Sequence, residues 1–188
     1  MRTAILACFT ILSLAACSPE PAKQEAPPAS TAAPAPIPGD LMVTLTDPSQ
    51  LSVPAGSPIQ VTAVAGGLRL QGAVRNPSPQ IKTDGASIAV GAANERLYGG
   101  QRIRVTIRAR GVDGATGFHA AYSTNDNGNS GWRALPLTAT PDDAIFEFIV
   151  PAVVRGNDDY IGIVPPDTGA MEVQSIHVQI VSPAGLRN

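Results

Sequence analysis

Cysteine is nearly absent from this sequence. The 188 residues include only Cys8 and Cys17, both close to the N-terminus. The rest of the chain therefore has no disulfide to stabilise it, no thiol nucleophile and no cysteine ligand for a metal ion. Residues 40–188 are nevertheless long enough to bury a hydrophobic core without such crosslinks.

Lysine and net positive charge are also scarce. Lys23 and Lys82 are the only lysines, and the chain has 13 Lys and Arg residues against 15 Asp and Glu residues. Loss of Arg2 with an N-terminal leader would leave 12 cations against the same 15 acids, a formal charge of −3. Nucleic-acid-binding domains usually have a basic stripe or patch. We therefore expect no nucleic-acid partner.

Histidine offers little material for a catalytic or metal site. His119 and His177 are the only two, and neither has a second histidine or a cysteine nearby in the sequence. No G-x-S-x-G segment supports a serine nucleophile. The aspartate pairs at 142–143 and 158–159 follow a proline and an asparagine, which is typical of turns. We interpret the protein as non-enzymatic and expect no cofactor and no metal.

The N-terminus has the features of a targeting signal. Arg2 precedes an uncharged, mostly apolar run from Ala4 to Ala16, which is too short to span a bilayer as a helix of about 20 residues. A charged start, a short apolar run and small residues before a cleavage point are typical of a secretory signal peptide. We therefore assign residues 1–16 to a signal peptide that is removed.

The end of this run resembles the lipobox of bacterial lipoproteins, in the sequence Leu14-Ala15-Ala16-Cys17. The resemblance implies cleavage before Cys17 and acylation of that cysteine, for example with palmitate. Serine at position 18, where an aspartate would resemble an inner-membrane retention signal, implies the outer membrane, on its periplasmic or its outer side. Several acyl chains on one residue also anchor a protein far better than one chain. The alternative is an ordinary secreted protein.

A proline- and alanine-rich segment follows the cysteine. Residues 18–39 read SPEPAKQEAPPASTAAPAPIPG. Such a composition cannot bury enough apolar surface to fold, and it behaves as a semi-rigid spacer of roughly 70 Å at full polyproline extension. We therefore divide the chain into the leader 1–16, the lipidated cysteine and linker 17–39, and one domain at 40–188.

Long amphipathic helical stretches are absent from this domain. Short β-branched runs recur instead between clusters of Gly, Pro, Asn and Asp, which predicts strands separated by turns. Strands of this length and spacing favour an all-β fold, an antiparallel β-sandwich of the jelly-roll type. The runs cover residues 41–46, 59–64, 67–74, 86–92, 102–109, 117–123, 145–150, 160–164 and 172–181.

The region from Leu97 to Val181 resembles the jelly-roll domains of carbohydrate-binding modules and galactose-binding-like proteins. The segments that show this are, in order, YGGQRIRVTIRARG, FHAAYSTNDNGNSGW, FEFIVP, DDYIGIVP and EVQSIHVQIV. The resemblance implies a β-sandwich whose last strand pairs near the start of the domain, and a glycan ligand. The paired aromatic platform of many sugar-binding modules is not evident in the sequence.

The stretch QRIRVTIRARG, at 101–111, alternates between charged and apolar residues. Because successive side chains of a strand point to opposite faces, one face would be buried and the other exposed. The buried row would be Ile103, Val105, Ile107 and Ala109. The exposed row would include Arg102, Arg104, Arg108 and Arg110.

The row of arginines allows two interpretations. A guanidinium presents a planar fork of donors that suits a carboxylate, phosphate or sulfate, so the row could bind an anionic polymer of the cell envelope. Alternatively, acids on neighbouring strands, for which Glu147 and Glu172 are available, pair with the arginines on an ordinary solvated sheet face.

The loop STNDNGNSGWR, at 123–133, is the second candidate site. Amide and carboxylate side chains in such a loop commonly bond to their own backbone in turns. Amides beside an indole also suit a sugar, and alternate asparagines resemble a calcium loop, although Ser130 and Pro136 stand where its glycine and glutamate belong. The candidate ligand-binding residues are Asn125, Asp126, Asn127, Asn129 and Trp132.

Two classes of function remain. The first is a lipid-anchored, non-catalytic envelope module that binds a glycan or another anionic polymer, which the arginine row and the asparagine-rich loop favour. The second is a structural or protein-interaction lipoprotein of an outer-membrane assembly, which the low aromatic content of 4% favours. Fold class alone does not choose between them.

Overall fold

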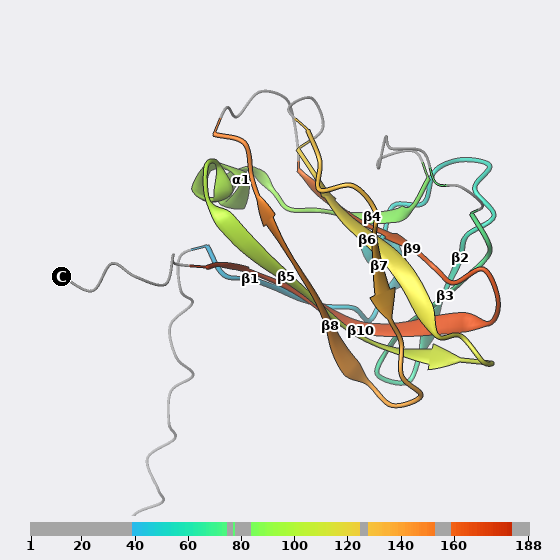
Figure 1. The fold of residues 1–188 in the computed structure, drawn as a ribbon. Helices are drawn as coiled ribbons and strands as arrows, with labels where there is room; N and C mark the ends of the chain where they lie inside the picture. Colours follow the sequence, from blue (N-terminus) through green and yellow to red (C-terminus); the bar gives the residue numbers. More distant parts are fainter. Residues whose placement is uncertain (1–38, 75–76, 78–83, 125–127, 153–158, 182–188) are drawn as a thin grey trace, which may run out of the picture. The chain divides into compact units, whose positions relative to one another are not determined.

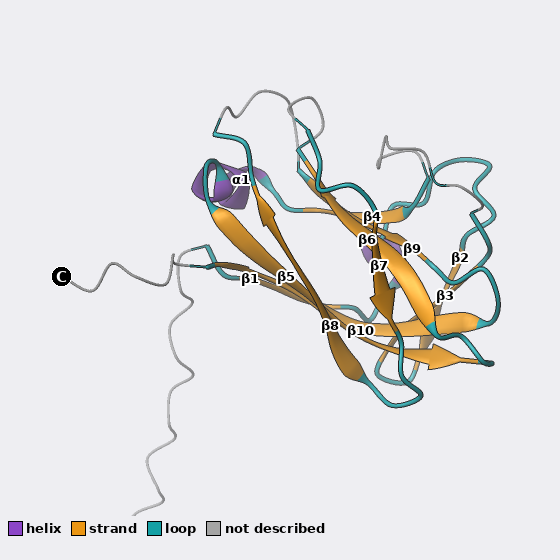
Figure 2. Ribbon diagram, viewed as in Figure 1, coloured by secondary structure: helices purple, strands orange, loops and turns teal. Residues whose placement is uncertain are grey.

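The computed structural model describes residues 39–74, 77, 84–124, 128–152 and 159–181, all within the compact unit Pro36–Asn188. These residues form two antiparallel β-sheets and little helix (Figures 1 and 2). The expected all-β sandwich is therefore confirmed. The signal peptide, Cys17, the linker and loop residues 125–127 lie outside the described residues.

Sheet A has six strands, in the order β2-β3-β10-β5-β8, with β1 paired to β10 beside β3. All its pairings are antiparallel, and β10 and β5 lie together over nearly their whole length. The strands are β1 (Leu41–Thr44), β2 (Gln60–Val64), β3 (Gly67–Gln71), β5 (Arg102–Val112), β8 (Asp142–Ile149) and β10 (Ala170–Ile180).

Sheet B has four strands, in the order β4-β9-β6-β7, and covers one side of sheet A (Figure 1). Its strands are β4 (Ala86–Ala89), β6 (Gly117–Ser123), β7 (Arg133–Pro136) and β9 (Tyr160–Val164). The sequence analysis did not identify β7, and it placed the aspartate pair at 142–143 in a turn. The structure includes both aspartates in β8.

Two short helical elements complete the described fold. A 3-10 turn, Pro48–Gln50, starts at Asp47, whose carboxylate accepts a hydrogen bond from the Ser49 amide. Helix α1 (Ala92–Tyr98) begins after Gly91 and ends before Gly99, whereas the sequence analysis ended a strand at residue 92 and identified no helix here. Its segment AANERLY is rich in good helix formers. Within the described residues, no helix is long and apolar enough to cross a membrane.

The interior between the sheets is formed by the apolar rows of the strands. Ile103, Val105 and Ile107 of β5 are fully buried, and Ile107 lies directly opposite Ile176 of β10. Burial of each such side chain stabilises the fold by about 1.5–3 kcal/mol. Ile176 and Val178 are also fully buried, in keeping with the alternation of the segment SIHVQIV, whereas Ile180 is only partly buried at the end of β10.

Candidate functional site: the outer faces of the two sheets

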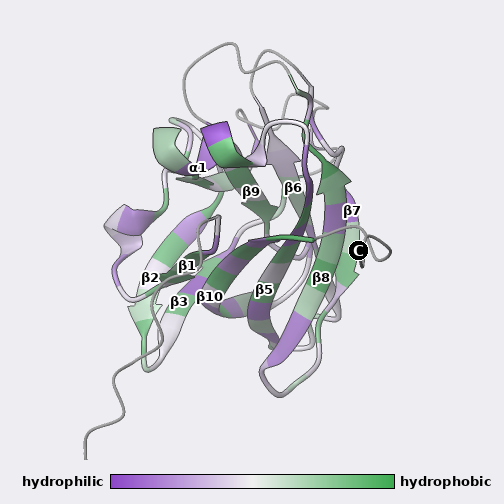
Figure 3. Cartoon of the chain, turned by 90° about the vertical axis from the view of Figure 1, so that its left-hand side faces the viewer, coloured by the Kyte–Doolittle hydropathy of each residue, from purple (hydrophilic) through white to green (hydrophobic). Residues whose placement is uncertain are grey.

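The arginine row lies on the outer face of sheet A, as the alternation of β5 predicts. Figure 3 shows this face, with hydrophilic and hydrophobic residues alternating along β5 and β8. At one end of the row, Arg104 donates two hydrogen bonds to Glu147 Oε1, from Nη2 at 2.8 Å and from Nε at 3.2 Å. Arg102 reaches the other oxygen of Glu147 at 3.5 Å. The bond from Arg104 is the main reason that the pKa of Glu147 is lowered.

The other two arginines of the row have carboxylates of their own. Arg108 is directly opposite Asp143 of β8 and pairs with it at 3.0 Å. Arg110 is opposite Glu172 of β10, and its Nη2 and Nε atoms lie 2.6 and 2.7 Å from Glu172 Oε2. Cross-strand pairing therefore accounts for most of the positive charge of the row.

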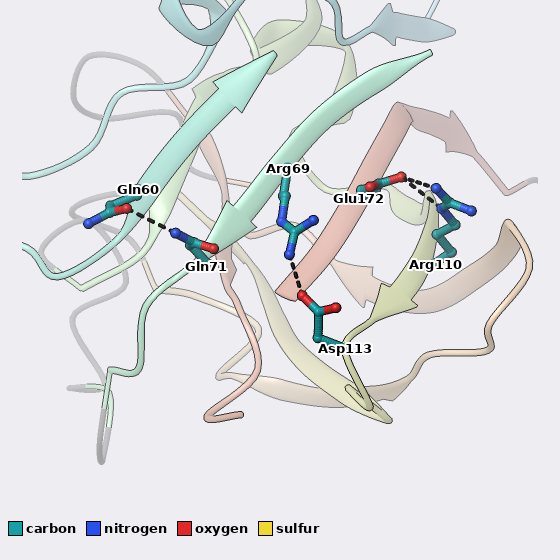
Figure 4. A network of polar contacts seen from close by, with 6 residues as sticks. All are labelled: Gln60, Arg69, Gln71, Arg110, Asp113 and Glu172. Carbon is teal, nitrogen blue, oxygen red and sulfur yellow. Dashed lines mark hydrogen bonds and ion pairs between the residues drawn. The ribbon is translucent and has the colours of Figure 1, made fainter. Parts of the chain in front are cut away.

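The polar contacts continue across the other half of sheet A (Figure 4). Arg69 of β3 forms an ion pair with Asp113, at the end of the β5 segment. Gln71 of β3 donates a hydrogen bond of 2.9 Å to Gln60 of β2. Most of the polar side chains on the outer face of sheet A are thus paired with one another.

The described part of the asparagine-rich loop bonds largely to itself. Asn129 Oδ1 accepts a hydrogen bond from the Gly131 amide at 2.8 Å, and Ser130 Oγ accepts one from the Tyr122 amide at 2.9 Å. Thr124 donates to the Gly128 carbonyl at 2.7 Å. These contacts are those of a structural hairpin. Asn125, Asp126 and Asn127 lie outside the described residues, and no metal-binding group of three or more His, Cys, Asp or Glu occurs within them.

The outer face of sheet B differs from that of sheet A because it is covered. Ala121 of β6 and Val164 of β9 are almost completely buried, yet neither packs in the core between the sheets. Ser87 of β4 is buried on the same face. Small residues on the outer side of three neighbouring strands, Ser87, Gly162 and Ala121, pair in one row across the sheet. We call this row the floor of sheet B.

Trp132 extends over this floor. Its Cη2 atom lies 2.9 Å from the position that a Cβ atom on Gly85 would take. Gly85 precedes β4 at one edge of the sheet, whereas Trp132 precedes β7 at the other edge. The half-buried indole therefore reaches across the two inner strands, where Ala121 and Gly162 leave room for it.

Two further rings belong to the same face. Tyr160 of β9 is half-buried and points outward, because its neighbour Ile161 is in the core and alternate residues of a strand share a face. His119 of β6 is half-buried and outward by the same argument, since Phe118 and Ala120 face the core. The sequence analysis did not single out Tyr160, although the alternation of YIGIV contains the signal.

A buried polar cluster fixes the start of the strand that holds Tyr160. The Tyr122 hydroxyl donates a hydrogen bond of 2.5 Å to Asp159, and the Asp159 amide donates one of 2.6 Å to Glu95 of α1. Asp159, Glu95 and Tyr122 are all buried. Burial, followed by the bond to Asp159, raises the pKa of Tyr122 far above its usual range. The contacts tie α1, β6 and β9 together at one end of the sandwich.

Tyr98, at the end of α1, is the exception in this region. It is fully buried, and its hydroxyl has no hydrogen-bond partner within the described residues. Burial, with a smaller contribution from the Asp40 carboxylate, raises the pKa of Tyr98 to about 12. The Leu41 backbone, although it makes no hydrogen bond to this hydroxyl, opposes the shift as the smallest of the three influences on the pKa of Tyr98.

No protein-family model and no curated protein matches the sequence. Among solved structures, the tandem CBM22-1-CBM22-2 domain of Paenibacillus barcinonensis Xyn10C is similar at a TM-score of 0.50 and 12% identity, over 78% of this chain and 47% of that one. The single CBM22-1 xylan-binding domain of the same protein gives 0.49 and 11%, over 77% and 95%. A family 29 carbohydrate-binding module from Piromyces equi gives 0.43 and 12%, over 78% and 94%.

The domain has the fold of a carbohydrate-binding module. The chain spans about half of the length of the tandem domain. At 12% identity the likeness shows the jelly-roll β-sandwich and nothing about a ligand.

Proposed function

We propose that this protein is a non-catalytic glycan-binding module whose ligand lies on the outer face of sheet B. The observation that supports the proposal is the half-buried indole of Trp132 above the floor of sheet B, with Tyr160 and His119 on the same face. The fold that the chain shares with carbohydrate-binding modules agrees with this choice.

The chemistry of this face suits a sugar ring. An aromatic side chain offers an apolar surface to the C–H side of a sugar, while polar ring atoms and hydroxyl groups fix its orientation. Trp132 and Tyr160 supply aromatic surface, and His119 supplies a ring nitrogen, from three different segments of the sheet. On the outer face of sheet A, by contrast, the arginines already form ion pairs with acidic side chains.

The anchoring of the module is part of the same proposal. Acylation of Cys17 would attach the chain to the outer membrane, and the linker 18–39 would let the domain reach a glycan of the envelope. Metabolic labelling with a fatty-acid analogue should mark the wild-type protein and not Cys17→Ala. Equal labelling of both proteins would contradict the anchor and leave the glycan proposal untouched.

The glycan site is tested through the fluorescence of Trp132, the only tryptophan in the chain. Titration with xylo-oligosaccharides, peptidoglycan fragments and lipopolysaccharide should change the emission for at least one of them. In calorimetry, Trp132→Ala should weaken that binding by about tenfold, since a stacked ring contributes about 0.5–1.5 kcal/mol beyond the apolar area that it buries. Arg108→Gln, on the opposite face, is the matched control and should bind as the wild type does.

A failure of every glycan in this panel would overturn the proposal. The structural alternative would then be favoured by a separate observation on sheet A. Met42, Ile145 and Ile149 are 58%, 50% and 57% exposed on its outer face. Ile145 and Ile149 are both exposed on β8, and neighbouring exposed apolar side chains are the kind that a protein partner covers.

A further inference from the structure

The ion pairs on the outer face of sheet A leave one arginine poorly matched. Five described arginines share four carboxylates there, because Glu147 serves both Arg102 and Arg104. Glu147 is closer to Arg104, at 2.8 Å, than to Arg102, at 3.5 Å. The positive charge left over is therefore concentrated at Arg102, whose side chain is 51% exposed.

Arg102 also lines a hollow of about 200 Å³. Gly100 and Gln101 line it from the link between α1 and β5, and Ile149 and Val181 line it from the ends of β8 and β10. Arg102 and Ile149 are directly opposite each other on paired strands, so the charged and the apolar wall are adjacent. Gly100, at a φ of 75°, has a conformation that favours glycine and allows this link to turn sharply.

The lining indicates the chemical class of the ligand. The guanidinium fork suits a carboxylate, and a single cation beside aliphatic walls suits a group of charge −1 better than a phosphate ester of about −1.5 to −2. Ile149 and Val181 would contact an aliphatic group, and no aromatic ring that could stack on a sugar lines the hollow within the described residues. The volume equals roughly six or seven waters, which is ample for a carboxylate and one small aliphatic side chain.

We propose that this hollow, which we call the Arg102 hollow, binds the C-terminal carboxylate of a peptide that ends in a small aliphatic residue. Arg102 would hold the carboxylate, the Gln101 amide would contact the last peptide group, and Ile149 and Val181 would pack against the side chain. This site is separate from the glycan face of sheet B, and its test does not depend on Trp132.

The test uses the full chain, with N-acetyl-alanyl-alanine as the probe and its C-terminal amide as the uncharged control ligand. In a titration followed by amide NMR, the free acid should shift the signals of Gln101, Arg102 and Val181 with a Kd on the order of millimolar. The amide should bind about tenfold or more weakly, because the charge-assisted hydrogen bonds are lost. Binding of the acid should weaken as the salt concentration rises, because an exposed charge is screened.

Two pairs of variants complete the test. Arg102→Gln should weaken binding about tenfold or more, while Arg108→Gln, on the same strand face but paired with Asp143, should not. Ile149→Asp should abolish binding, while Ile145→Asp, on the same strand face but not in the lining of this hollow, should not. All four positions are on the exposed face of sheet A, so the variants should remain folded.

Several results would overturn the proposal. The simplest of them is an absence of detectable binding at about 10 mM dipeptide, a concentration above the expected millimolar Kd. Equal binding of the acid and the amide, or wild-type affinity in both Arg102→Gln and Ile149→Asp, would do the same. Tighter binding of galacturonate or inorganic phosphate than of the dipeptide would assign the hollow to another ligand. None of these results bears on Trp132.

Discussion

The outer faces of the two sheets show opposite ways of completing a β-sandwich. On sheet A, charged side chains of neighbouring strands pair with one another and stay in contact with water. On sheet B, Gly162 and Ala121 in the middle of the inner strands are small, and Ala121 and Val164 are almost fully buried beneath other parts of the chain. The outer face of sheet A is therefore stabilised by ion pairs, whereas that of sheet B is covered by other parts of the chain.

This difference explains why the more conspicuous sequence feature is not the better candidate site. A row of arginines attracts attention, but each of its members has a carboxylate within 3.5 Å. A ligand on Arg104, Arg108 or Arg110 must displace an acid before it gains a contact. The floor of sheet B has no charge at all, and it supports a half-buried indole that remains partly accessible.

The largest expected effect separates the two sides of sheet A. Ile107→Ala should lower the free energy of unfolding by about 2–5 kcal/mol, because Ile107 is fully buried and truncation leaves a cavity. Ile145→Ala, on the outer face of the neighbouring strand, should change it by less than about 0.5 kcal/mol. Urea denaturation of both variants is the measurement. Similar losses would show that the outer face of sheet A is covered by something and is not a solvated surface.

The inner and outer rows of β5 could be predicted because strand alternation is a local property of the sequence. Pairing partners depend on register, which is not local. Glu147 and Glu172 were suggested as partners, but Asp143 was assigned to a turn, and only the alignment of β8 with β5 places it opposite Arg108. From the sequence alone, the arginine row therefore has fewer acidic partners than it has arginines.

The aromatic face of sheet B was missed for a similar reason. Trp132, Tyr160 and His119 come from separate segments, and only the strand order β9-β6-β7 brings them to one face. The floor beneath them consists of single small residues that have no pattern within any one strand. Helix α1 and strand β7 are short, and neither has enough residues for a recognisable period.

An intermediate effect concerns the buried hydroxyls beneath sheet B. Tyr122→Phe should lower the free energy of unfolding by about 1–3 kcal/mol, because it removes the hydrogen bond to the buried carboxylate of Asp159. Tyr98→Phe should leave stability unchanged or slightly higher, since the hydroxyl that it removes has no partner within the described residues. Thermal unfolding of the two variants measures the difference. Equal destabilisation would indicate that Tyr98 bonds to an ordered water.

The same tyrosines make the domain sensitive to alkaline pH. A phenol with an unfolded pKa of 10.0 and a folded pKa of about 12 stabilises the fold fully below pH 10, and this contribution is lost as the pH rises through 12. The wild type should therefore lose stability between about pH 10 and 12. Tyr98→Phe should lose less stability than the wild type over the same pH range. Denaturant titrations at pH 8, 10 and 11 would check this, and identical losses would contradict the burial of the Tyr98 phenol as the cause.

The smallest expected effect on stability belongs to the arginine row itself. Arg104→Gln combined with Arg108→Gln removes one ion pair to Glu147 and one to Asp143, both on an exposed face. Exposed pairs contribute about 0–1 kcal/mol each, so the free energy of unfolding of the double variant should lie within about 2 kcal/mol of the wild-type value. The difference should become smaller at high salt, because exposed charges are screened. Binding of glycans to sheet B should not change.

The double variant also decides the prediction that at least two of the four arginines contact an anionic polymer of the envelope. For such a polymer to bind, its charges must replace Glu147 and Asp143 as partners, and the released carboxylates then repel it. Affinity that is present in the wild type, lost in the double variant and reduced by salt would confirm the prediction despite that cost. Equal affinity of both proteins for peptidoglycan, lipopolysaccharide and acidic glycans would leave these two arginines a structural role only. Because Arg104→Gln leaves Glu147 to pair with Arg102 alone, binding of a dipeptide at the Arg102 hollow should weaken in the double variant and persist in Arg108→Gln.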